Sequence, residues 1–597
     1  MTKNYDNLNR LTSITSTPLG SSAFSYSYSY NSANQRTQTV LADGSYWTYS
    51  YDSLGQVIAG QKYWSDNTPV AGEQFGYAFD TIGNRQSITA NGNLGTYTAN
   101  SLNQYTQRSV PGYVWELGDA ASNATVTVNL QPTVRKGQFF SKELSVANSS
   151  SAVYTQLTTV AVLKNAGVSQ YDIVTTATGH EFVAKSPELY SYDADGNLTN
   201  DGRFAYQWDG ENRLISMVAQ ASLPAGVPQE KILFGYDYMG RRVSKVVSNF
   251  NGSAWSLGTG LKFVYDGWNL LAEIDTNNAI VRSYTWGLDL SGSPQGAGGI
   301  GGLLMISTAS SGTHLPAYDG NGNVMALVDG SSGSVSAQYE YGPFGETLRA
   351  TGTAASLNPF RFSTKCADAE TELLYYGYRY YTPNAGRWLN RDPITESGSH
   401  LSKFPTREYQ PYLFNVDDGV NKYDFIGMMP LSAVESIYQA RKNATAAANI
   451  MCCNCCHVTH QYSIYGGALG GSIVFAGTSW KNCTDGACNG PYNSTYFWWD
   501  CYSSGAEAGL LHFPPSGDLR YGWSQGDRAY FKVATPSSLS FLGQFFGFDP
   551  YHLAVASIVM YEQCVNGQAQ TLETFSNTLE FTWSISSQHW TGPTGNP

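Results

Sequence analysis

A short unit that recurs between Tyr5 and Val324 constrains the fold more than any other feature of this sequence. The unit has an aromatic residue, Asp or Asn, two spacers, Gly or Asn, and then Arg, Leu or Val at the start of an apolar run. Clear copies begin at Tyr5, Tyr51, Phe79, Tyr192, Trp208, Tyr236 and Tyr318. Asp and Gly favour a turn with positive φ, and the flanking Tyr, Val and Leu favour strands. Because one hairpin cannot bury its own apolar face, the copies are expected to form a continuous sheet.

The composition supports a mainly β fold. The chain has 597 residues, and only 13% of them are charged, while Gly (61) and Tyr (42) are abundant. Such a composition suits sheets and turns better than long solvated helices. The length predicts more than one structural unit.

Further landmarks follow the last repeat at residues 339–346, 359–363, 375–381 and 386–393, where the chain reads YEYGPFGE, PFRFS, YYGYRYY and GRWLNRDP. With these landmarks the chain resembles the Rhs/YD-repeat proteins of bacteria, and most strongly their repeat-associated core. The resemblance implies a spiral of β-hairpins that closes into a hollow shell around a C-terminal payload.

Changes in pattern predict five segments. They are YD repeats at 1–113, an inserted small β domain at 114–187, YD repeats at 188–317, the Rhs core at 318–428 and a Cys-rich variable C-terminal domain at 429–597. The insert alternates apolar and polar residues, as strands do. The C-terminal domain is predicted to be α+β, because a capping-box pattern at Ser432 opens an Ala-rich helix to about Ile450 and strand-like segments follow.

The resemblance also implies self-cleavage. Rhs cores typically end in an Arg-Asp-Pro segment and a later Asp-Pro-x-Gly-Leu segment, and two aspartates are proposed to cut the chain after the Leu. The counterparts here contain Asp392 and Asp424, and scission would fall between Met428 and Met429. Asp392 and Asp424 are therefore the candidate catalytic pair, with Arg391 tuning the ionised partner.

The chemistry of the cut needs two carboxylates because one must be ionised to activate water while the other stays protonated to polarise the carbonyl. The alternative interpretation is structural, with Asp392 capping a turn before Pro393 and Asp424 ending a strand. The chain departs from the family pattern at Thr395-Glu396, which replaces Gly-Leu, and Met428 stands for Leu.

The C-terminal segment holds eight of the nine cysteines. The disulfide or metal candidates are Cys452, Cys453, Cys455, Cys456, His457, His460, Cys483, Cys488, Cys501 and Cys564. Disulfides suit an exported domain with an even number of Cys. A zinc site and a Cys nucleophile paired with His457 or His460 are the alternatives. No other cofactor is expected. His512, Asp518, His552 and His589 are further candidates for acid/base work.

Charge and hydropathy limit the partners. The net charge is -12 and no dense Lys/Arg run occurs, so the shell is not expected to bind nucleic acid directly. No apolar run reaches the roughly 20 residues of a membrane span. No secretory leader is found, and the chain begins within a repeat, so we expect a fragment whose missing N-terminal part carries the export signal.

Two functions fit these features. The first is a secreted or cell-surface effector of the polymorphic-toxin type, whose shell holds its own C-terminal payload and releases it by aspartate autoproteolysis, with an immunity protein and secretion machinery as possible partners. The second is an adhesion or binding protein whose Cys-rich module is disulfide-stapled and not catalytic. The fold alone does not assign the chemistry of the payload.

Overall fold

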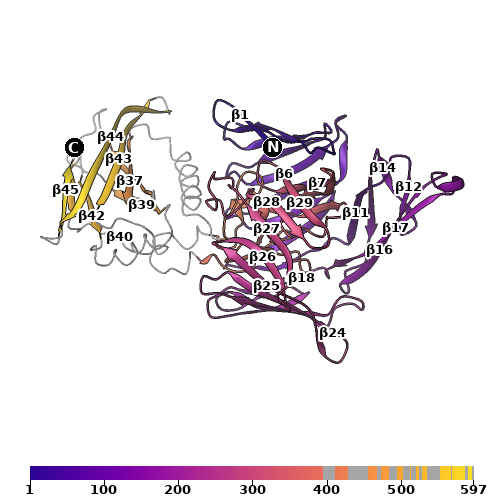
Figure 1. Cartoon of the computed structure of the whole chain (residues 1–597). Helices are drawn as coiled ribbons and strands as arrows, with labels where there is room; N and C mark the ends of the chain where they lie inside the picture. Colours follow the sequence, from indigo (N-terminus) through magenta and orange to yellow (C-terminus); the bar gives the residue numbers. More distant parts are fainter. Residues whose placement is uncertain are drawn as a thin grey trace. The chain divides into compact units, whose positions relative to one another are not determined.

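The computed structural model describes residues 1–393 and 410–427, together with the strands of the C-terminal part. The chain divides into two compact units, Met1–Pro430 and Leu431–Pro597. Strands form almost all of the regular structure in the described residues (Figure 1). The expected mainly β, hairpin-repeat fold is confirmed. Among the described residues, none belongs to a helix that is long and apolar enough to cross a lipid bilayer.

The first sheet has eleven strands that follow one another in sequence order and end on β18. They are β1 (Thr2–Tyr5), β2 (Leu11–Ser16), β3 (Phe24–Tyr30), β4 (Arg36–Leu41), β5 (Tyr46–Tyr51), β6 (Val57–Tyr63), β7 (Pro69–Phe79), β8 (Arg85–Ala90), β9 (Asn93–Ala99), β10 (Tyr105–Arg108) and β18 (Glu188–Leu189). Each strand pairs antiparallel with the next along the chain, so the sheet is a continuous meander.

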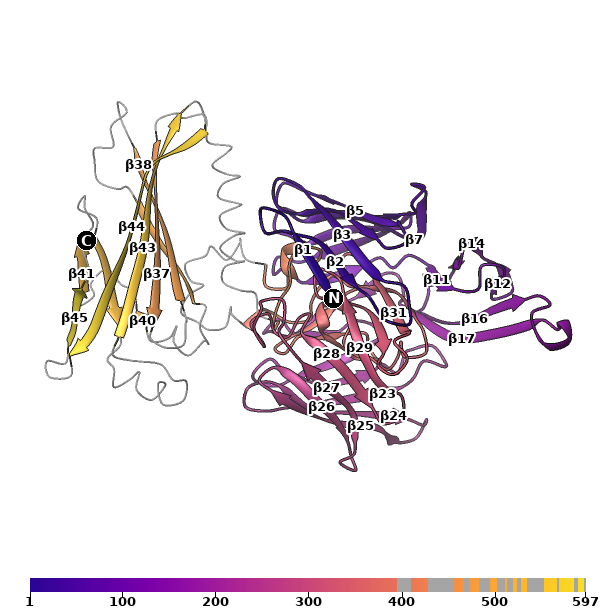
Figure 2. The same cartoon turned by 45° about the horizontal axis from the view of Figure 1, so that its top comes forward.

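The second sheet has fourteen strands, also in sequence order. They are β19 (Ser191–Tyr192), β20 (Leu198–Asn200), β21 (Phe204–Trp208), β22 (Leu214–Ala219), β23 (Glu230–Tyr236), β24 (Arg242–Phe250), β25 (Trp255–Asp266), β26 (Asn269–Asp275), β27 (Ile280–Trp286), β28 (Leu303–Thr308), β29 (Gly312–Tyr318), β30 (Val324–Asp329), β31 (Val335–Tyr341) and β32 (Thr347–Thr351). In Figures 1 and 2 the two sheets lie on different sides of the same unit.

The inserted segment between β10 and β18 forms two small sheets, ordered β11-β15-β14 and β13-β12-β16-β17. The strands are β11 (Tyr113–Asp119), β12 (Thr125–Val128), β13 (Gln131–Pro132), β14 (Val134–Lys136), β15 (Phe139–Ser145), β16 (Val153–Leu163) and β17 (Ile173–Val183), with a 3₁₀ turn η1 (Val168–Gln170) between the last two. Val114, Val128, Phe140, Leu157 and Val183 are among the buried residues of its own apolar core.

In the C-terminal unit the described residues form sheets ordered β39-β38-β37-β43-β44-β45 and β40-β42-β41. The strands are β37 (Cys455–Gly466), β38 (Ser472–Asn482), β39 (Ser494–Cys501), β40 (Leu511–His512), β41 (Leu519–Gly522), β42 (Arg528–Val533), β43 (His552–Val565), β44 (Gln568–Ser584) and β45 (His589–Thr594). The helix expected at 432–450 lies outside the described residues.

Each repeat unit closes its own turn through the Asp or Asn side chain. In the copy at Asp237, one carboxylate oxygen accepts hydrogen bonds from the backbone N–H groups of Met239 (2.9 Å) and Arg241 (3.0 Å), and Gly240 has φ +78°. The same two bonds are made by Asp6, Asn31, Asp52, Asp80, Asn100, Asp209, Asp275 and Asp319. The Gly or Asn of the unit is therefore required by the left-handed backbone that lets both amides reach the carboxylate.

The aromatic residue of the unit connects one turn to the preceding one. The hydroxyl of Tyr236 donates to the backbone carbonyl of Leu214 at 2.7 Å, and the indole N–H of Trp208 donates to that of Leu198 at 2.7 Å. Tyr30, Tyr51, Tyr265 and Tyr341 make equivalent bonds to Leu11, Arg36, Arg242 and Val324. The hydroxyl satisfies a carbonyl that follows a turn, and the ring covers the sheet.

Residues 354–393 and 410–427, here called the belt, pack against both sheets. They contain β33 (Cys366–Ala367), β34 (Leu374–Tyr375), β35 (Tyr380–Thr382) and β36 (Arg387–Trp388), with 3₁₀ turns η2 (Phe362–Thr364) and η5 (Asn415–Asp417). The belt aromatics Tyr376, Tyr380, Tyr381, Trp388 and Phe414 are buried in one large apolar cluster, together with inward residues of the second sheet. The belt is thus the centre of the core of the first unit.

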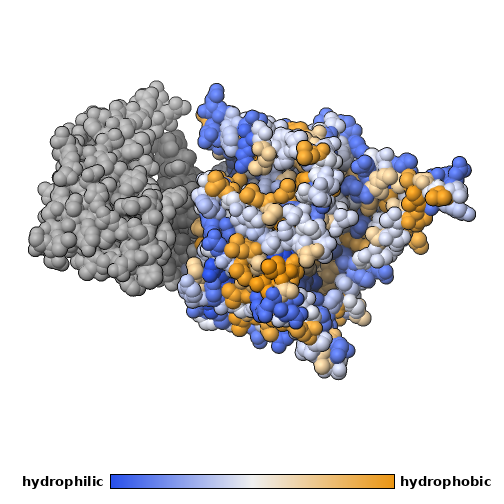
Figure 3. Space-filling model, viewed as in Figure 1, coloured by the Kyte–Doolittle hydropathy of each residue, from blue (hydrophilic) through white to orange (hydrophobic). Residues whose placement is uncertain are grey.

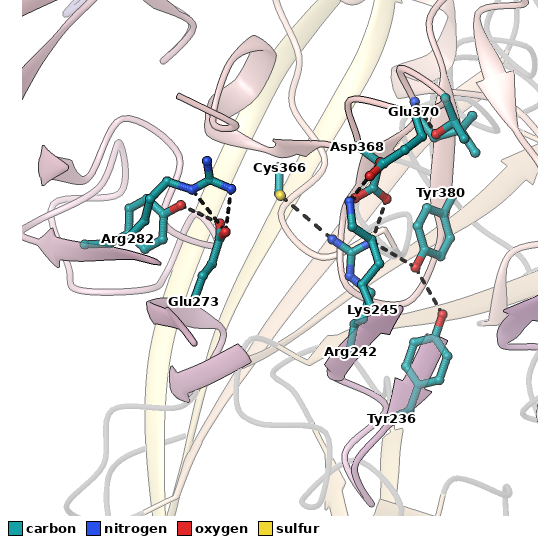
Figure 4. A network of polar contacts seen from close by, with 12 residues as sticks. Tyr236, Arg242, Lys245, Glu273, Arg282, Cys366, Asp368, Glu370 and Tyr380 are labelled. Atoms are coloured by element: carbon teal, nitrogen blue, oxygen red, sulfur yellow. Dashed lines mark hydrogen bonds and ion pairs between the residues drawn. The ribbon is translucent and has the colours of Figure 1, made fainter. Parts of the chain in front are cut away.

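Buried polar bonds attach the belt to each sheet. On the second sheet, Arg242 is paired with Asp368 at 2.5 Å, and Lys245 reaches Asp368 at 3.0 Å and Glu370 at 2.9 Å (Figure 4). The strand β24 therefore supplies the cations and the belt supplies the carboxylates. Paired charges of this kind are costly to break, because the remaining partner would be buried alone.

On the first sheet the contacts are hydrogen bonds in which at least one partner is uncharged. The Gln56 amide donates to the Asp417 carboxyl at 2.6 Å, and the Gln104 amide donates to the Tyr412 hydroxyl at 3.1 Å. The Arg387 guanidinium donates to the Asn103 carbonyl at 2.8 Å. These belt residues bond positions that adjoin or belong to the repeat turns, so the turn register also sets the position of the belt.

We expect Tyr236→Phe to lower the free energy of unfolding of the first unit by about 1 kcal/mol, because it leaves the Leu214 carbonyl without its donor. Tyr238→Phe is the matched control, since Tyr238 lies two residues away and is 93% exposed. Urea denaturation followed by tryptophan fluorescence measures both. Equal effects of the two substitutions would contradict a structural role for the repeat hydroxyl.

Candidate self-cleavage site

Asp392 and Asp424, the two aspartates that the sequence singles out, converge on one arginine. Nη2 of Arg379 lies 2.8 Å from a carboxylate oxygen of Asp392 and 3.5 Å from one of Asp424. Arg379, Asp392 and Asp424 are at most 3% exposed. The structure therefore brings together two buried carboxylates that are 32 positions apart in the sequence, which is the arrangement that the cleavage hypothesis needs.

The surroundings of Asp424 favour its protonated form. Burial raises the pKa of Asp424 to about 6, and the nearby charge of Asp392 adds to the increase, while Arg379 and the Gly427 N–H oppose it. One oxygen of Asp424 accepts hydrogen bonds from the backbone N–H groups of Ile426 (3.2 Å) and Gly427 (2.8 Å). Asp424 thus closes a local turn and can also carry a proton in mildly acidic solution.

Three successive carbonyls after Asp424 each have a donor from the belt. The Phe425 carbonyl accepts from Nζ of Lys365 at 2.5 Å, and the Ile426 carbonyl accepts from the Tyr378 backbone N–H at 3.0 Å. The Gly427 carbonyl accepts from Nε of Arg379. The segment that leads to the expected cut is therefore held in one position.

Arg379 and Lys365 were not identified as site residues from the sequence. Arg379 belongs to the YYGYRYY landmark, and Lys365 follows the PFRFS landmark. Arg379 is the one cation in this Tyr-rich run, which could have marked it as a candidate. The sequence does not indicate which carboxylate it would pair with. Burial lowers the pKa of Lys365 to about 8, so the side chain is still mainly charged at neutral pH.

Arg391 is the arginine that the sequence favoured, and it is half-buried. Its side chain packs closely against the backbone at Gly196, where an added Cβ atom would lie 2.8 Å from Cδ of Arg391. The arginine that contacts both carboxylates is Arg379. A tuning role for Arg391 stays a prediction. Met428 and Met429 lie outside the described residues, so the position of the cut also stays a prediction.

The candidate residues of the C-terminal unit are distributed over several strands. Cys455, Cys456, His457 and His460 belong to β37, Cys501 ends β39, Cys564 lies in β43, and His512, His552 and His589 are at strand ends. The register pairs Cys456 with Lys481 and Gln563. The backbone of Cys564 is therefore near that of Cys456. Cys452, Cys453, Cys483, Cys488 and Asp518 lie outside the described residues, and the choice between disulfides and zinc stays a prediction.

Family models match two parts of this chain. The teneurin YD-shell model matches residues 298–431, and the RHS repeat model matches residues 5–46 and 30–68. The first match includes Arg379, Asp392 and Asp424. The second covers three of the Asp or Asn turns described above, those at Asp6, Asn31 and Asp52.

Several curated proteins are similar in sequence. The tRNA3(Ser)-specific nuclease WapA of Bacillus spizizenii is 31% identical over 209 residues, which cover 34% of this chain and 8% of that protein. Toxin subunit YenC2 of Yersinia entomophaga is 25% identical over 463 residues, 69% of this chain and 44% of that protein. Double-stranded DNA deaminase toxin A of Burkholderia cenocepacia is 29% identical over 224 residues, which cover 35% of this chain and 15% of that protein. The matched part of this chain spans less than half the length of each relative.

Solved structures also match. The crystal structure of TcdB2-TccC3-Cdc42 has a TM-score of 0.33 and 16% identity over 73% of this chain and 21% of that chain. The crystal structure of TcdB2-TccC3 without the hypervariable C-terminal region has a TM-score of 0.32 and 17% identity over 71% of this chain and 20% of that chain.

The consecutive hairpins, their Asp-closed turns and the matched models together define a repeat protein of the β-shell class. The residues that these models match have the sequence of Rhs/YD-repeat proteins, which confirms the resemblance that the sequence landmarks predicted.

We expect Arg379→Gln to lower the free energy of unfolding by about 3 to 5 kcal/mol, because two buried carboxylates lose the guanidinium that contacts them. Arg391→Gln is the matched control and should cost about 1 kcal/mol or less, since Arg391 is half-buried. Denaturant titration of both purified variants gives the comparison. A larger cost for Arg391→Gln would assign the main electrostatic role to Arg391.

Proposed function

We propose that this chain is the shell part of a toxin-type protein that holds residues 429–597 as its payload and cuts its own backbone between Met428 and Met429. The convergence of Asp392, Asp424 and the Gly427 carbonyl on Arg379 carries this proposal. A side chain that binds both carboxylates and the chain next to the expected cut would serve a cleavage site directly.

The proposed reaction assigns the two aspartates different roles. Asp392, next to the Arg379 cation, is the ionised base that removes a proton from water, and the resulting hydroxide attacks the carbonyl carbon of Met428. Asp424, with its raised pKa, is the acid that donates a hydrogen bond to the carbonyl oxygen. The tetrahedral intermediate then breaks its C–N bond, and the proton that Asp392 took from water passes to the Met429 nitrogen, which restores the Asp392 carboxylate. No cofactor is proposed for this reaction.

Lys365 and Tyr378 are the proposed positioning residues. They bind the Phe425 and Ile426 carbonyls, which fixes the chain before the proposed cut. Holding the substrate in one geometry removes much of the entropic cost of an attack. In this proposal the scissile bond is presented by the belt itself, so cleavage occurs within one molecule.

The names of the relatives support a role in antagonism, because they include nucleases, a deaminase toxin and a toxin subunit. We therefore propose export to the cell surface or the medium, competition between bacteria as the setting, and an immunity protein that protects the producing cell. A payload that is held in a shell until release cannot reach its target in the producer.

The wild-type chain is expected to give two bands on a denaturing gel, with the second beginning at Met429 by N-terminal sequencing. Asp392→Asn and Asp424→Asn should each give a single full-length band, because neither retains both the base and the acid. Asp417→Asn is the matched control, since Asp417 is a buried belt carboxyl that bonds Gln56 instead of Arg379. A single full-length band for the folded wild-type chain would overturn the proposal.

The rate of cleavage is expected to fall by about tenfold per pH unit once the pH rises above about 6, because Asp424 must keep its proton to act as the acid. The chain is refolded from denaturant at a series of pH values, and the cut fraction is followed on gels and normalised to the folded fraction by fluorescence. A rate that rises through this range would give Asp424 the role of base.

A further inference from the structure

The inserted domain ends in a strand that has a neighbour on one side only. β17 is the last strand of the sheet β13-β12-β16-β17 and pairs with β16 over eleven consecutive residues without a register shift. In Figures 1 and 2, β16 and β17 project away from the two large sheets. The other edge of β17 therefore presents a regular row of backbone donors and acceptors.

The other sheet edges in Met1–Gly427 differ from this one. The next longest edge strand there is β11, which has seven residues and carries Glu116 and Asp119. β1 has four residues and includes Lys3, and β32 has five and includes Arg349. Short length and charged residues are the usual protection of edges against pairing. β17 has no Lys, Arg or Pro, and Glu181 is its single acidic residue.

β17 and the turn before it are exposed and carry several apolar side chains. Residues 173–181 are all exposed, and they read IVTTATGHE. At the adjoining turn Val168 is 91% exposed and Tyr171 is 75% exposed. Figure 3 shows hydrophobic residues on this projecting part of the molecule. Thr, Val and Ile are favoured in paired strands, and this edge lacks a pairing partner.

The charge of the insert favours a second copy of the same chain as the partner. Residues 114–187 contain five acidic and five basic residues, whereas the whole chain has a net charge of -12. Two copies repel each other through most of their surface, and they approach at least cost where the local net charge is zero.

The exposed part of β17 is also compatible with antiparallel pairing to itself. A two-fold axis at Ala177 places Thr176 opposite Thr178 and Thr175 opposite Gly179 of the other copy. Glu181 then faces Ile173, so no like charges are opposed, and the Thr pairs are favourable across strands. A contact of this kind uses the same patch on both copies and closes as a dimer.

We propose that two copies of this chain associate through the free edge of β17, which joins their four-stranded insert sheets into one continuous antiparallel sheet. The contact does not include Arg379, Asp392 or Asp424 of the proposed cleavage site. It gives the shell a dimeric form in which the two inserts make the interface.

Sedimentation equilibrium of the full chain tests the proposal. The wild type should show a monomer–dimer equilibrium at micromolar concentration. The double variant Thr176→Lys with Thr178→Lys should raise the dissociation constant at least about tenfold, because charged residues on an edge oppose pairing. Thr285→Lys is the matched control, since Thr285 is exposed on the central strand β27. A monomeric wild type, or a dimer unaffected by the double variant, would overturn the proposal.

Hydrogen exchange of the wild-type chain provides a measurement that does not depend on the folding of a variant. The backbone amides of residues 173–181 that face away from β16 should exchange more slowly at high protein concentration than at low concentration. Amides of β27 should exchange equally at both, because their partners lie within one chain. Exchange of 173–181 that is independent of concentration would contradict the interface.

Discussion

The hydrogen bonds that the Asp or Asn side chains of the repeat turns accept from the following backbone amides are the interaction on which the rest of the structure depends. They close these turns within a few residues, so each of these hairpins is defined by contacts that are local in the sequence. Two further residues complete the unit. One has positive φ, and the other is the aromatic residue that donates a hydrogen bond to the preceding turn, so each unit connects to the one before it. Two sheets of eleven and fourteen strands result from this one local rule.

Sheets built in this way have apolar inner faces that they cannot cover themselves, and the belt covers them. It does so with aromatic rings and with buried ion pairs, such as Arg242 with Asp368. The pair Asp392 and Asp424 belongs to this same packing. Both contact Arg379 only when the two segments of the belt, 354–393 and 410–427, lie together. In the proposed reaction, a carboxylate pair assembled by packing would act only in a folded shell, so the proposed cut would follow completion of the fold.

The sequence predicted the features that repeat or that lie in linear landmarks. The strands and turns follow from the Tyr-Asp unit, and Asp392 and Asp424 follow from their ordered motifs. Arg379 and Lys365 could not be assigned in this way, because their roles arise where three distant segments meet, at 365, 379 and 424–427. Arg391 adjoins Asp392 in the Arg-Asp-Pro motif and its tuning role stays a prediction, whereas the guanidinium that contacts both carboxylates belongs to Arg379. The partner of a buried carboxylate is a property of the packing.

The position of the insert follows from the same local rule. β10 pairs directly with β18, through Gln107 with Leu189 and Arg108 with Glu188, so the chain leaves the first sheet and returns at neighbouring positions. An insertion between two paired strands leaves the ladder intact and adds only the cost of closing a loop, which grows slowly with length. The spiral can therefore carry an additional domain, with its own core and its own free edge, without a change in the turns that build the shell. Because each repeat turn is closed by its own side chain, the surfaces that the scaffold presents can change while the contacts that stabilise it stay the same.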